Sequence, residues 1–350
     1  CVAGRRSGPG ASGIGKTGSK VLKILLTGST GWLGRHLAPL LEASGHRVVG
    51  LDVAPGPFTR VIGTVADRAL IDQTFADHGI EAVIHAGALH KPDIARFPRQ
   101  AFIDTNVTGT LNLLEAADAA GHDRFVMTST TSLMISQAIR NEAGPAAVWL
   151  DEDHGPLAPR NIYGVTKLAA EGLCRQFALE THLSCVVLRT SRFFPEDDDT
   201  LSDSSPDNLK ANEFLHRRLT VDDAARAHIV ALDKAPELGF GLYIVSAPSP
   251  FRREDCPALK RDAAGVISGY YPAAVSLYAD KGWKLPAQIG RVYDASRFER
   301  DTGFRCATDF ASVLSALDTG APLPFTHDSA YASPSEAGRD RIIRQGPTGA

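Results

Sequence analysis

Tyr163 and Lys167 stand four residues apart in the segment YGVTK, and this spacing would place both side chains on one face of a helix. A lysine ammonium favours the phenolate form of a neighbouring tyrosine. We therefore expect Lys167 to draw the pKa of Tyr163 from its usual value of about 10 towards neutrality, where the phenol can exchange a proton with a substrate hydroxyl. The spacing alone is common by chance, and an exposed helix face is the alternative interpretation.

A glycine-rich turn, TGSTGWLG at residues 27–34, follows an apolar run and precedes a helical pattern. In this order of elements, Gly28 permits a tight turn, Gly31 lets the backbone approach a diphosphate, and Gly34 lets the helix pack closely on the sheet. The helix N-terminus would then face the phosphates. The pattern predicts a dinucleotide site that includes Trp32 and Leu33, and the alternative is a glycine-rich turn without a ligand.

Asp52 ends the second apolar run, VVGLD. A carboxylate at this point can accept hydrogen bonds from the adenosine ribose hydroxyls and would repel a 2′-phosphate. The cofactor predicted is therefore NAD and not NADP, although Arg60 could fold back towards a 2′-phosphate. A solvated carboxylate at the end of a strand is the alternative.

Hydroxyl side chains fill the segment TSTTS at residues 128–132, where a further strand ends. The carboxyl ends of parallel strands face the ligand crevice in such sheets. A hydroxyl here could hydrogen-bond the reacting oxygen beside Tyr163. The alternative is a polar strand end that caps neighbouring backbone groups.

Short apolar runs that alternate with longer helical patterns predict an α/β fold with a doubly wound parallel Rossmann sheet. The expected strands cover residues 21–27, 46–52, 59–65, 81–86, 124–129, 184–189 and 241–246. The expected helices cover residues 33–44, 69–78, 100–120, 163–181 and 221–235. We expect a disordered N-terminal extension at 1–20, an NAD-binding domain at 21–190, a smaller substrate-binding lobe at 191–325 with elements returning to the first domain, and a flexible tail at 326–350.

Composition narrows the classes of protein. A formal charge of -3 with dispersed Lys and Arg argues against nucleic acid as a partner. The five cysteines form no C-x-x-C pair, so we expect reduced thiols, no metal site and a cytoplasmic protein. No apolar run is long enough to cross a membrane. Residues 10–17 spell a phosphate-binding loop, GASGIGKT, but polar residues precede them and a strand follows, so we expect the stretch to be inert.

The chain resembles the extended short-chain dehydrogenase/reductases, the NAD-dependent epimerase/dehydratase family. The resemblance rests on TGSTGWLG, Asp52, Asp67, IHAGA, NVTGTLNLLEAA, FVMTSTTS, YGVTK and VVLRTS in this order. It implies that Asp67 contacts adenine and that Ala86, Gly87 and Ala88 line the cofactor cleft. It also implies that Thr130 is the catalytic hydroxyl and that Lys167 holds the nicotinamide ribose. The helices that contain Asn106 and Tyr163 would form the interface of a homodimer.

Within this family, dehydratases place an Asp-Glu pair directly after the catalytic Thr, whereas this chain has Thr131 and Ser132. The resemblance therefore favours an NAD-dependent epimerase of a nucleotide sugar. An NAD-dependent alcohol or sugar dehydrogenase and a catalytically silent NAD-binding regulator stay open. A nucleoside diphosphate needs cations, and the candidates, each singly more typical of a surface arginine, are Arg192, Arg217, Arg218 and Arg291.

Overall fold

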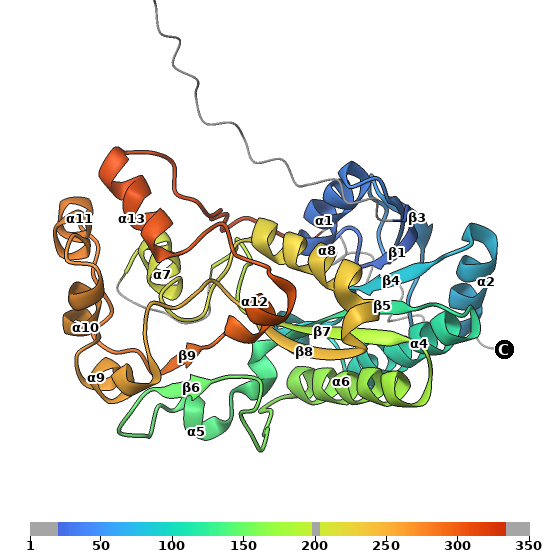
Figure 1. The fold of residues 1–350 in the computed structure, drawn as a ribbon, viewed down its shortest axis with the longest axis horizontal. Helices are drawn as coiled ribbons and strands as arrows, with labels where there is room; N and C mark the ends of the chain where they lie inside the picture. The colour runs from blue at the N-terminus through green and yellow to red at the C-terminus, as the bar shows by residue number, and fades with distance from the viewer. Residues whose placement is uncertain (1–19, 198–203, 334–350) are drawn as a thin grey trace, which may run out of the picture.

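Seven parallel strands form the central sheet of the computed structural model, which describes residues 20–197 and 204–333 (Figure 1). The order across the sheet is β3-β2-β1-β4-β5-β7-β8, and every neighbouring pair is parallel. The chain reverses direction across the sheet between β1 and β4, which creates the switch point where such folds bind ligands. The strands are β1 (Lys23–Thr27), β2 (Arg47–Asp52), β3 (Thr59–Ile62), β4 (Ala82–His85), β5 (Arg124–Thr130), β7 (Ser184–Thr190) and β8 (Phe240–Val245).

Helices cover both faces of this sheet. One face packs against α1 (Trp32–Ala43) and α8 (Val221–Leu238). The other face packs against α2 (Arg68–His78), α4 (Gly109–Ala119) and α6 (Ile162–Glu180). The doubly wound α/β class expected from the sequence is confirmed.

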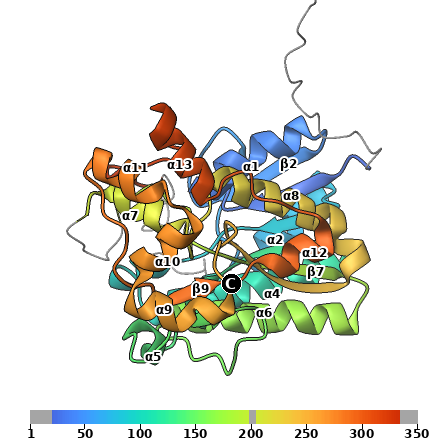
Figure 2. The same cartoon turned by 60° about the vertical axis from the view of Figure 1, so that its left-hand side comes forward.

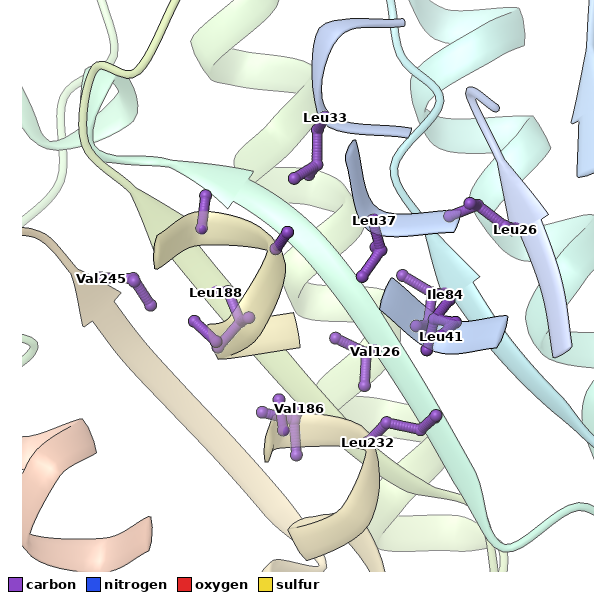
Figure 3. Close-up of a cluster of buried hydrophobic side chains, with 14 of the residues drawn as sticks. Leu26, Leu33, Leu37, Leu41, Ile84, Val126, Val186, Leu188, Leu232 and Val245 are labelled. Atoms are coloured by element: carbon purple, nitrogen blue, oxygen red, sulfur yellow. The ribbon is translucent and has the colours of Figure 1, made fainter. Parts of the chain in front are cut away.

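The packing of α1 follows directly from its sequence. Leu33, Leu37 and Leu41 recur at the spacing of one helix face and are buried against the strands. Figure 3 shows them together with Leu232 of α8, beside Ile84, Val126, Val186 and Leu188 of the sheet. Burial of each such side chain contributes about 1.5–3 kcal/mol, so these contacts fix the helix that follows the glycine turn.

A smaller lobe lies beside the sheet, and Figures 1 and 2 show it on the side where the β8 and β7 strands end. Its short strands β6 (Val148–Leu150) and β9 (Arg291–Tyr293) pair in parallel. Its helices share one apolar cluster and are α7 (Pro206–Glu213), α9 (Cys256–Arg261), α10 (Ala263–Tyr270), α11 (Ala274–Lys281) and α13 (Phe310–Thr319). The lobe thus takes β6 from within residues 21–190, while α8, β8 and α12 (Ser296–Thr302) pack with the sheet domain.

Short elements connect the larger ones. They are η1 (Lys91–Ala95), α3 (Arg99–Phe102), the π-helical turn η2 (Ile103–Thr108), η3 (Thr131–Met134), α5 (Gln137–Arg140) and η4 (Arg253–Asp255). The helix expected at 100–120 is therefore one run from Arg99 to Ala119 interrupted by η2. π-helical turns often mark functional sites, because they re-aim a side chain.

The sequence predicts a disordered extension at 1–20 and a flexible tail at 326–350. The extension at 1–20 and its phosphate-loop pattern lie outside the described residues, apart from Lys20. Of the expected tail, residues 326–333 are described. The backbone N–H of Asp328 donates to Pro195 O at 2.9 Å, and the Tyr331 ring packs edge-on against Trp32 at 5.0 Å. The beginning of the expected tail is thus anchored to the folded domain.

Candidate active site

The glycine turn connects β1 to α1 at the switch point of the sheet. Gly28 has a φ of +73°, and an added Cβ there would lie 2.8 Å from Gly87 N. A Cβ on Gly34 would lie 2.1 Å from Gly28 O, so no side chain fits where α1 packs on the turn. The N-cap residue, Gly31, makes no side-chain hydrogen bond to the first turn of α1. The N–H groups of this turn therefore point to a place suited to a diphosphate.

Asp52 closes the turn from the neighbouring strand. Its carboxylate accepts hydrogen bonds from Thr30 N at 3.0 Å and Ala54 N at 3.3 Å, which fixes its orientation. Four of the residues predicted to bind the cofactor line one cavity, together with residues that follow β3 and with Thr105 of η2. The lining includes Gly28, Asp52, Thr64, Gly87, Ala88 and Thr105.

The loop after β4 is tied to the glycine turn by a buried histidine. The hydroxyl of Thr27 lies 2.7 Å from His85 Nδ1 and accepts a hydrogen bond from Gly87 N at 3.0 Å. The other ring nitrogen of His85 lies 3.1 Å from Thr110 Oγ1. Burial lowers the pKa of His85 to about 3, so this histidine is neutral and acts as a fixed hydrogen-bonding bridge.

Asp67, for which the resemblance implies an adenine contact, lies at the start of α2. Its carboxylate accepts from Leu70 N at 3.1 Å and caps the start of α2. Thr64, three positions earlier, lines the cavity in its place. The adenine contact of Asp67 stays a prediction.

Tyr163 and Lys167 lie on the first turns of α6, whose N-cap Asn161 accepts from Gly164 N at 3.0 Å. Thr130 at the end of β5 hydrogen-bonds the Tyr163 phenol. Thr130 Oγ1 also accepts from Ser132 N at 3.1 Å, which fixes the position of the threonine hydroxyl. The structure thus brings together the three residues that the sequence predicted for catalysis.

Asn106 of η2 positions this part of α6. Its side chain accepts from Leu89 N at 2.8 Å and donates to Leu89 O at 3.0 Å and to Thr166 Oγ1 at 3.1 Å. One amide therefore links the loop after β4 to the helix that carries Tyr163. This buried link holds the cofactor side and the catalytic side of the site in register.

The pKa of Tyr163 differs from the expectation. Burial raises it to about 12, and the nearby Asp93 also raises it, while the Thr130 hydrogen bond opposes the change only in part. The predicted lowering by Lys167 is therefore wrong for this geometry, because burial disfavours the phenolate and Lys167 is not among the groups that lower this pKa. Burial also lowers the pKa of Lys167 to about 8, so the charged form of each group is less favoured than in an exposed side chain.

Sequence reasoning missed an aromatic contact beside Tyr163. The His90 ring stacks on the Tyr163 ring with centroids 6.0 Å apart, and it meets the Phe194 ring edge-on at 5.7 Å. Phe194 follows β7 and stacks on Phe193 at 4.6 Å. The only signal in the sequence is that each residue follows a strand that ends at the switch point.

Asp93 is a carboxylate that the sequence did not place near Tyr163. It is buried in η1, accepts from His90 N at 2.7 Å, and lies 4.0 Å from an Arg96 Nη1. A carboxylate held in this way serves the local turn. It does not provide a second acid or base for a substrate.

Three of the four arginines predicted for substrate surround one carboxylate, Glu213 of α7. Arg217 Nη2 lies 2.9 Å, Arg218 Nη1 2.8 Å and Arg192 Nη1 3.8 Å from the Glu213 oxygens. Burial alone would raise the pKa of Glu213, but the three guanidinium charges outweigh it and hold that pKa at about 2. One negative charge thus faces three positive charges, which leaves a net positive surface.

The four arginines differ in what they can offer a ligand. Arg218 is 2% exposed and donates to Glu213 Oε2 and to Phe194 O at 2.7 Å. These bonds hold α7 and the segment after β7 together, and they leave little of the Arg218 side chain open to the substrate predicted for it. Arg192 is 35% exposed and Arg217 is 15% exposed. Arg291 lies in β9, and its Nε is buried without a hydrogen-bond partner among the described residues. Burial lowers the pKa of the neighbouring His216, and the charges of Arg217 and Arg291 lower it further.

A line of contacts joins this cluster to the catalytic tyrosine. Arg218 binds the carbonyl of Phe194, the Phe194 ring touches His90, and His90 stacks on Tyr163. The arginines therefore border the same region as the catalytic residues, from the side of the smaller lobe. A larger cavity of about 440 Å³ lies between the ends of β8 and β9 and holds none of the predicted site residues.

Residues 20–197 and 204–333 contain neither a metal site nor a membrane-spanning helix. In these ranges, no group of three or more His, Cys, Asp and Glu side chains is arranged to hold a metal ion. No helix in the same ranges combines the length and the apolar character needed to span a membrane.

Two curated proteins are similar in sequence to about half of this chain. The UDP-glucose 4-epimerase of Rhizobium meliloti (strain 1021) is 34% identical over 173 residues, which cover 47% of this chain and 50% of that protein. The UDP-glucose 4-epimerase of Azospirillum brasilense is 30% identical over 176 residues, which cover 48% of each chain. This chain thus spans about half the length of the curated relatives it matches.

Solved structures resemble the whole fold. A short-chain dehydrogenase/reductase superfamily protein from Agrobacterium tumefaciens with bound NAD superposes with a TM-score of 0.58 at 24% identity and covers 85% of this chain and 96% of its own. The UDP-N-acetylglucosamine 4-epimerase from Bacillus cereus gives a TM-score of 0.59 at 20% identity and covers 85% and 98%. At these identities the likeness shows the fold.

The fold and the Tyr163, Lys167 and Thr130 arrangement define an extended short-chain dehydrogenase/reductase. Residues 24–208 match the NAD dependent epimerase/dehydratase family, which is more than half of the chain. The protein belongs to that family.

Proposed function

We propose that the protein is an NAD-dependent epimerase that inverts one hydroxyl-bearing carbon of a nucleotide sugar. The observation that carries the proposal is the Thr130 hydrogen bond to the Tyr163 phenol at the edge of the sheet where the glycine turn also lies. The same edge thus offers a place for a dinucleotide and one proton-transfer group. The names of the relatives, UDP-glucose 4-epimerases, support this reaction class.

The residues of this chain fit NAD. Gly28 and Gly34 have no room for a Cβ, and the first turn of α1 has no side-chain cap, so the backbone can receive the diphosphate. Asp52 would receive the ribose hydroxyls and oppose a 2′-phosphate. Lys167 would hold the nicotinamide ribose. Bound NAD would supply a hydride acceptor at its nicotinamide ring.

Three side chains would act at the reacting hydroxyl, and one of them would carry the proton. Tyr163 would take the proton of the substrate hydroxyl and return it, and Thr130 would hold the reacting oxygen beside it. Because burial raises its pKa to about 12, Tyr163 is protonated near neutral pH, so the phenol must lose its proton before it can accept the proton of the substrate hydroxyl. The Lys167 ammonium would favour the phenolate that oxidation of the substrate consumes and that reduction of the ketone forms again.

The substrate proposal rests on the arginines at the border of the smaller lobe. Arg192, Arg217 and Arg291 would bind the diphosphate, because guanidinium groups match phosphate oxygens in charge and geometry. Arg218 of the same cluster binds Phe194 O, and the Phe194 and His90 rings continue from there to Tyr163, so the sugar would pass over these two rings.

Reactions that remove water need a second acid or base. The described residues around Tyr163 offer no side chain suited to that role. Thr131 Oγ1 donates to Thr190 O at 3.3 Å, Ser132 follows it in η3, and Asp93 is buried in its own turn. One proton-transfer group is sufficient for an epimerase or a dehydrogenase.

The deciding experiment adds UDP-sugars to the purified protein with NAD and follows both the sugar products and the absorbance of reduced cofactor. An epimerase gives a transient absorbance and an epimer, whereas a dehydrogenase accumulates the absorbance and an oxidised product. The absence of any product or absorbance change with all nucleotide sugars would favour the silent regulator and reject the proposal.

We also propose that the protein forms a homodimer through α6 and the α3–α4 run. Ile103 of η2 and Val165 of α6 are large apolar side chains that are exposed, and the two elements pack together through Asn106 and Thr166. Light scattering should give the mass of a dimer, and Val165→Glu should give a monomer. A wild-type monomer at all concentrations would contradict this proposal.

A further inference from the structure

A buried carboxylate, Glu171, lies on α6 one turn after Lys167 and two turns after Tyr163. Helical spacing of four residues puts the three side chains on one face of the helix. Glu171 is 5% exposed. None of the roles assigned so far to the site uses it, although it is the carboxylate nearest to Lys167 along this helix.

Glu171 joins three elements through short hydrogen bonds. Its Oε1 accepts from Ser129 Oγ of β5 at 2.6 Å and from Arg189 Nε of β7 at 3.0 Å. Its Oε2 accepts from Arg189 Nη2 at 2.7 Å. Arg189 is itself buried, and its Nη1 has no hydrogen-bond partner among the described residues.

This network lies directly behind the catalytic hydroxyl. Ser129 precedes Thr130 in β5, and Thr190 Oγ1 of β7 donates to the Ser129 carbonyl at 3.1 Å. The position of Thr130 relative to Tyr163 therefore depends on how β5 and α6 are held together. Glu171 is the side chain on α6 that bonds to β5 at this level.

Stability gives little reason to keep a buried ion pair at this place. The cost of removing two charges from water commonly equals or exceeds the attraction between them, and apolar side chains of similar volume often replace such pairs without loss. A buried pair with an unsatisfied Arg189 nitrogen is therefore better explained by what it positions.

We propose that Glu171 is a positioning residue for the reaction proposed above: with Ser129 and Arg189 it holds the catalytic helix against the strand that carries Thr130, and it places a fixed negative charge one turn from the Lys167 ammonium. The expected effects on kcat rest on the proposed function. The electrostatic part of the inference concerns Lys167 alone and can be measured without substrate.

The charges around Lys167 determine the sign of the effect. Glu171 and Cys174 face it from α6, His85 faces it from β4, and Arg189 lies behind Glu171 on β7. Burial lowers the pKa of Lys167 to about 8, and Cys174 and then Glu171 oppose that lowering. Removal of the carboxylate charge leaves the Arg189 cation uncompensated, so the pKa of Lys167 must fall further.

The first experiment compares Glu171→Gln with Glu180→Gln, a matched control on an exposed part of the same helix. Lysine side chains are labelled with ¹³C, and the pH titration of Lys167 is assigned with Lys167→Met. We expect Glu171→Gln to lower the Lys167 midpoint by about one pH unit, as one charge at this spacing does in a partly screened interior. We expect Glu180→Gln to leave the midpoint unchanged. An unmoved midpoint in Glu171→Gln overturns the electrostatic part.

The second experiment measures turnover against pH. Activity that needs the Lys167 ammonium is lost above the Lys167 midpoint, so Glu171→Gln should move the alkaline limb of kcat to lower pH and lower kcat by about tenfold or more. NAD affinity below the midpoint should stay within about twofold. An unchanged alkaline limb and an unchanged kcat contradict the inference.

Ser129→Ala tests the geometric part with a variant that keeps both charges of the ion pair and is small enough to fold. We expect kcat to fall severalfold while the Lys167 titration stays at its wild-type midpoint. Wild-type kcat in Ser129→Ala would refute positioning through β5. If wild-type protein turns over no nucleotide sugar, the proposed function fails, while the Lys167 titrations still decide the electrostatic part.

Discussion

The Tyr163→Phe variant tests the chemistry most directly, because it removes one oxygen and keeps the ring. The phenyl ring can still stack on His90, and α6 keeps its N-cap at Asn161. Loss of a general acid and base lowers turnover by about 10² or more. A factor of 10² corresponds to about 2.7 kcal/mol of activation free energy at about 1.36 kcal/mol per tenfold.

The same substitution should cost little stability. It removes one hydrogen bond, from Thr130, which is worth about 1 kcal/mol. Thr130 Oγ1 keeps the hydrogen bond from Ser132 N, so its oxygen is not left without a partner. We therefore expect the free energy of unfolding in urea to change by about 1 kcal/mol or less, with NAD affinity preserved.

The assay is steady-state turnover of a nucleotide sugar with saturating NAD, with NAD binding measured separately by calorimetry. Tyr270→Phe provides the matched control, because this exposed phenol donates to Asp255 at 2.7 Å, and its removal should leave kcat unchanged. Normal turnover in Tyr163→Phe would refute the mechanism. Loss of NAD binding in this variant would mean that Tyr163 acts mainly in cofactor binding.

Other predictions address the cofactor, the turn, the arginines and acid stability. Asp52→Ala should narrow the preference for NAD over NADP in direct titrations of both, and tighter NADP binding by the wild type would reject the role of Asp52. Gly34→Ala should destabilise the fold by about 2 kcal/mol or more because its Cβ has no room, whereas Gly172→Ala, whose Cβ meets nothing within 4 Å, should be neutral or stabilising in the same urea titration. Arg217→Gln should raise the KM for the nucleotide sugar with little change in kcat. Since the pKa of Glu213 is depressed to about 2, its stabilisation is present above a pH of about 4.5 and lost as the pH falls towards 2; Glu213→Gln should flatten that part of the stability profile.

The sheet domain could be predicted from the sequence because its signals are local. The strands read as short apolar runs, and β1, β4 and β7 are buried almost throughout. The glycine turn could be predicted from the spacing of its glycines, because no side chain fits at Gly28 or Gly34. The smaller lobe could not be predicted in detail, because strands of three residues and helices of six to ten carry little periodicity.

Within the site, the sequence predicted residue types but not their environments. The direction of the Tyr163 pKa depends on how deeply the fold buries it, which no local pattern records. The bond from Ser129 to Glu171 joins residues 42 positions apart, and only the adjacency of β5 and α6 makes it visible. The capping of α2 by Asp67 and the place of Thr64 in the cavity lining are likewise visible only in the fold.

The titratable groups around the catalytic phenol limit what the site can do. Tyr163 is the group that would pass a proton to a substrate oxygen, and Lys167 lies one turn further along the same helix. Asp93 is held by its own turn, and His85 is kept neutral by burial between two hydroxyls. A site with one proton carrier can oxidise or reduce one carbon–oxygen bond. The arginines around Glu213 would hold the nucleotide while the sugar turns to present its other face, and that requirement separates an epimerase from a dehydrogenase.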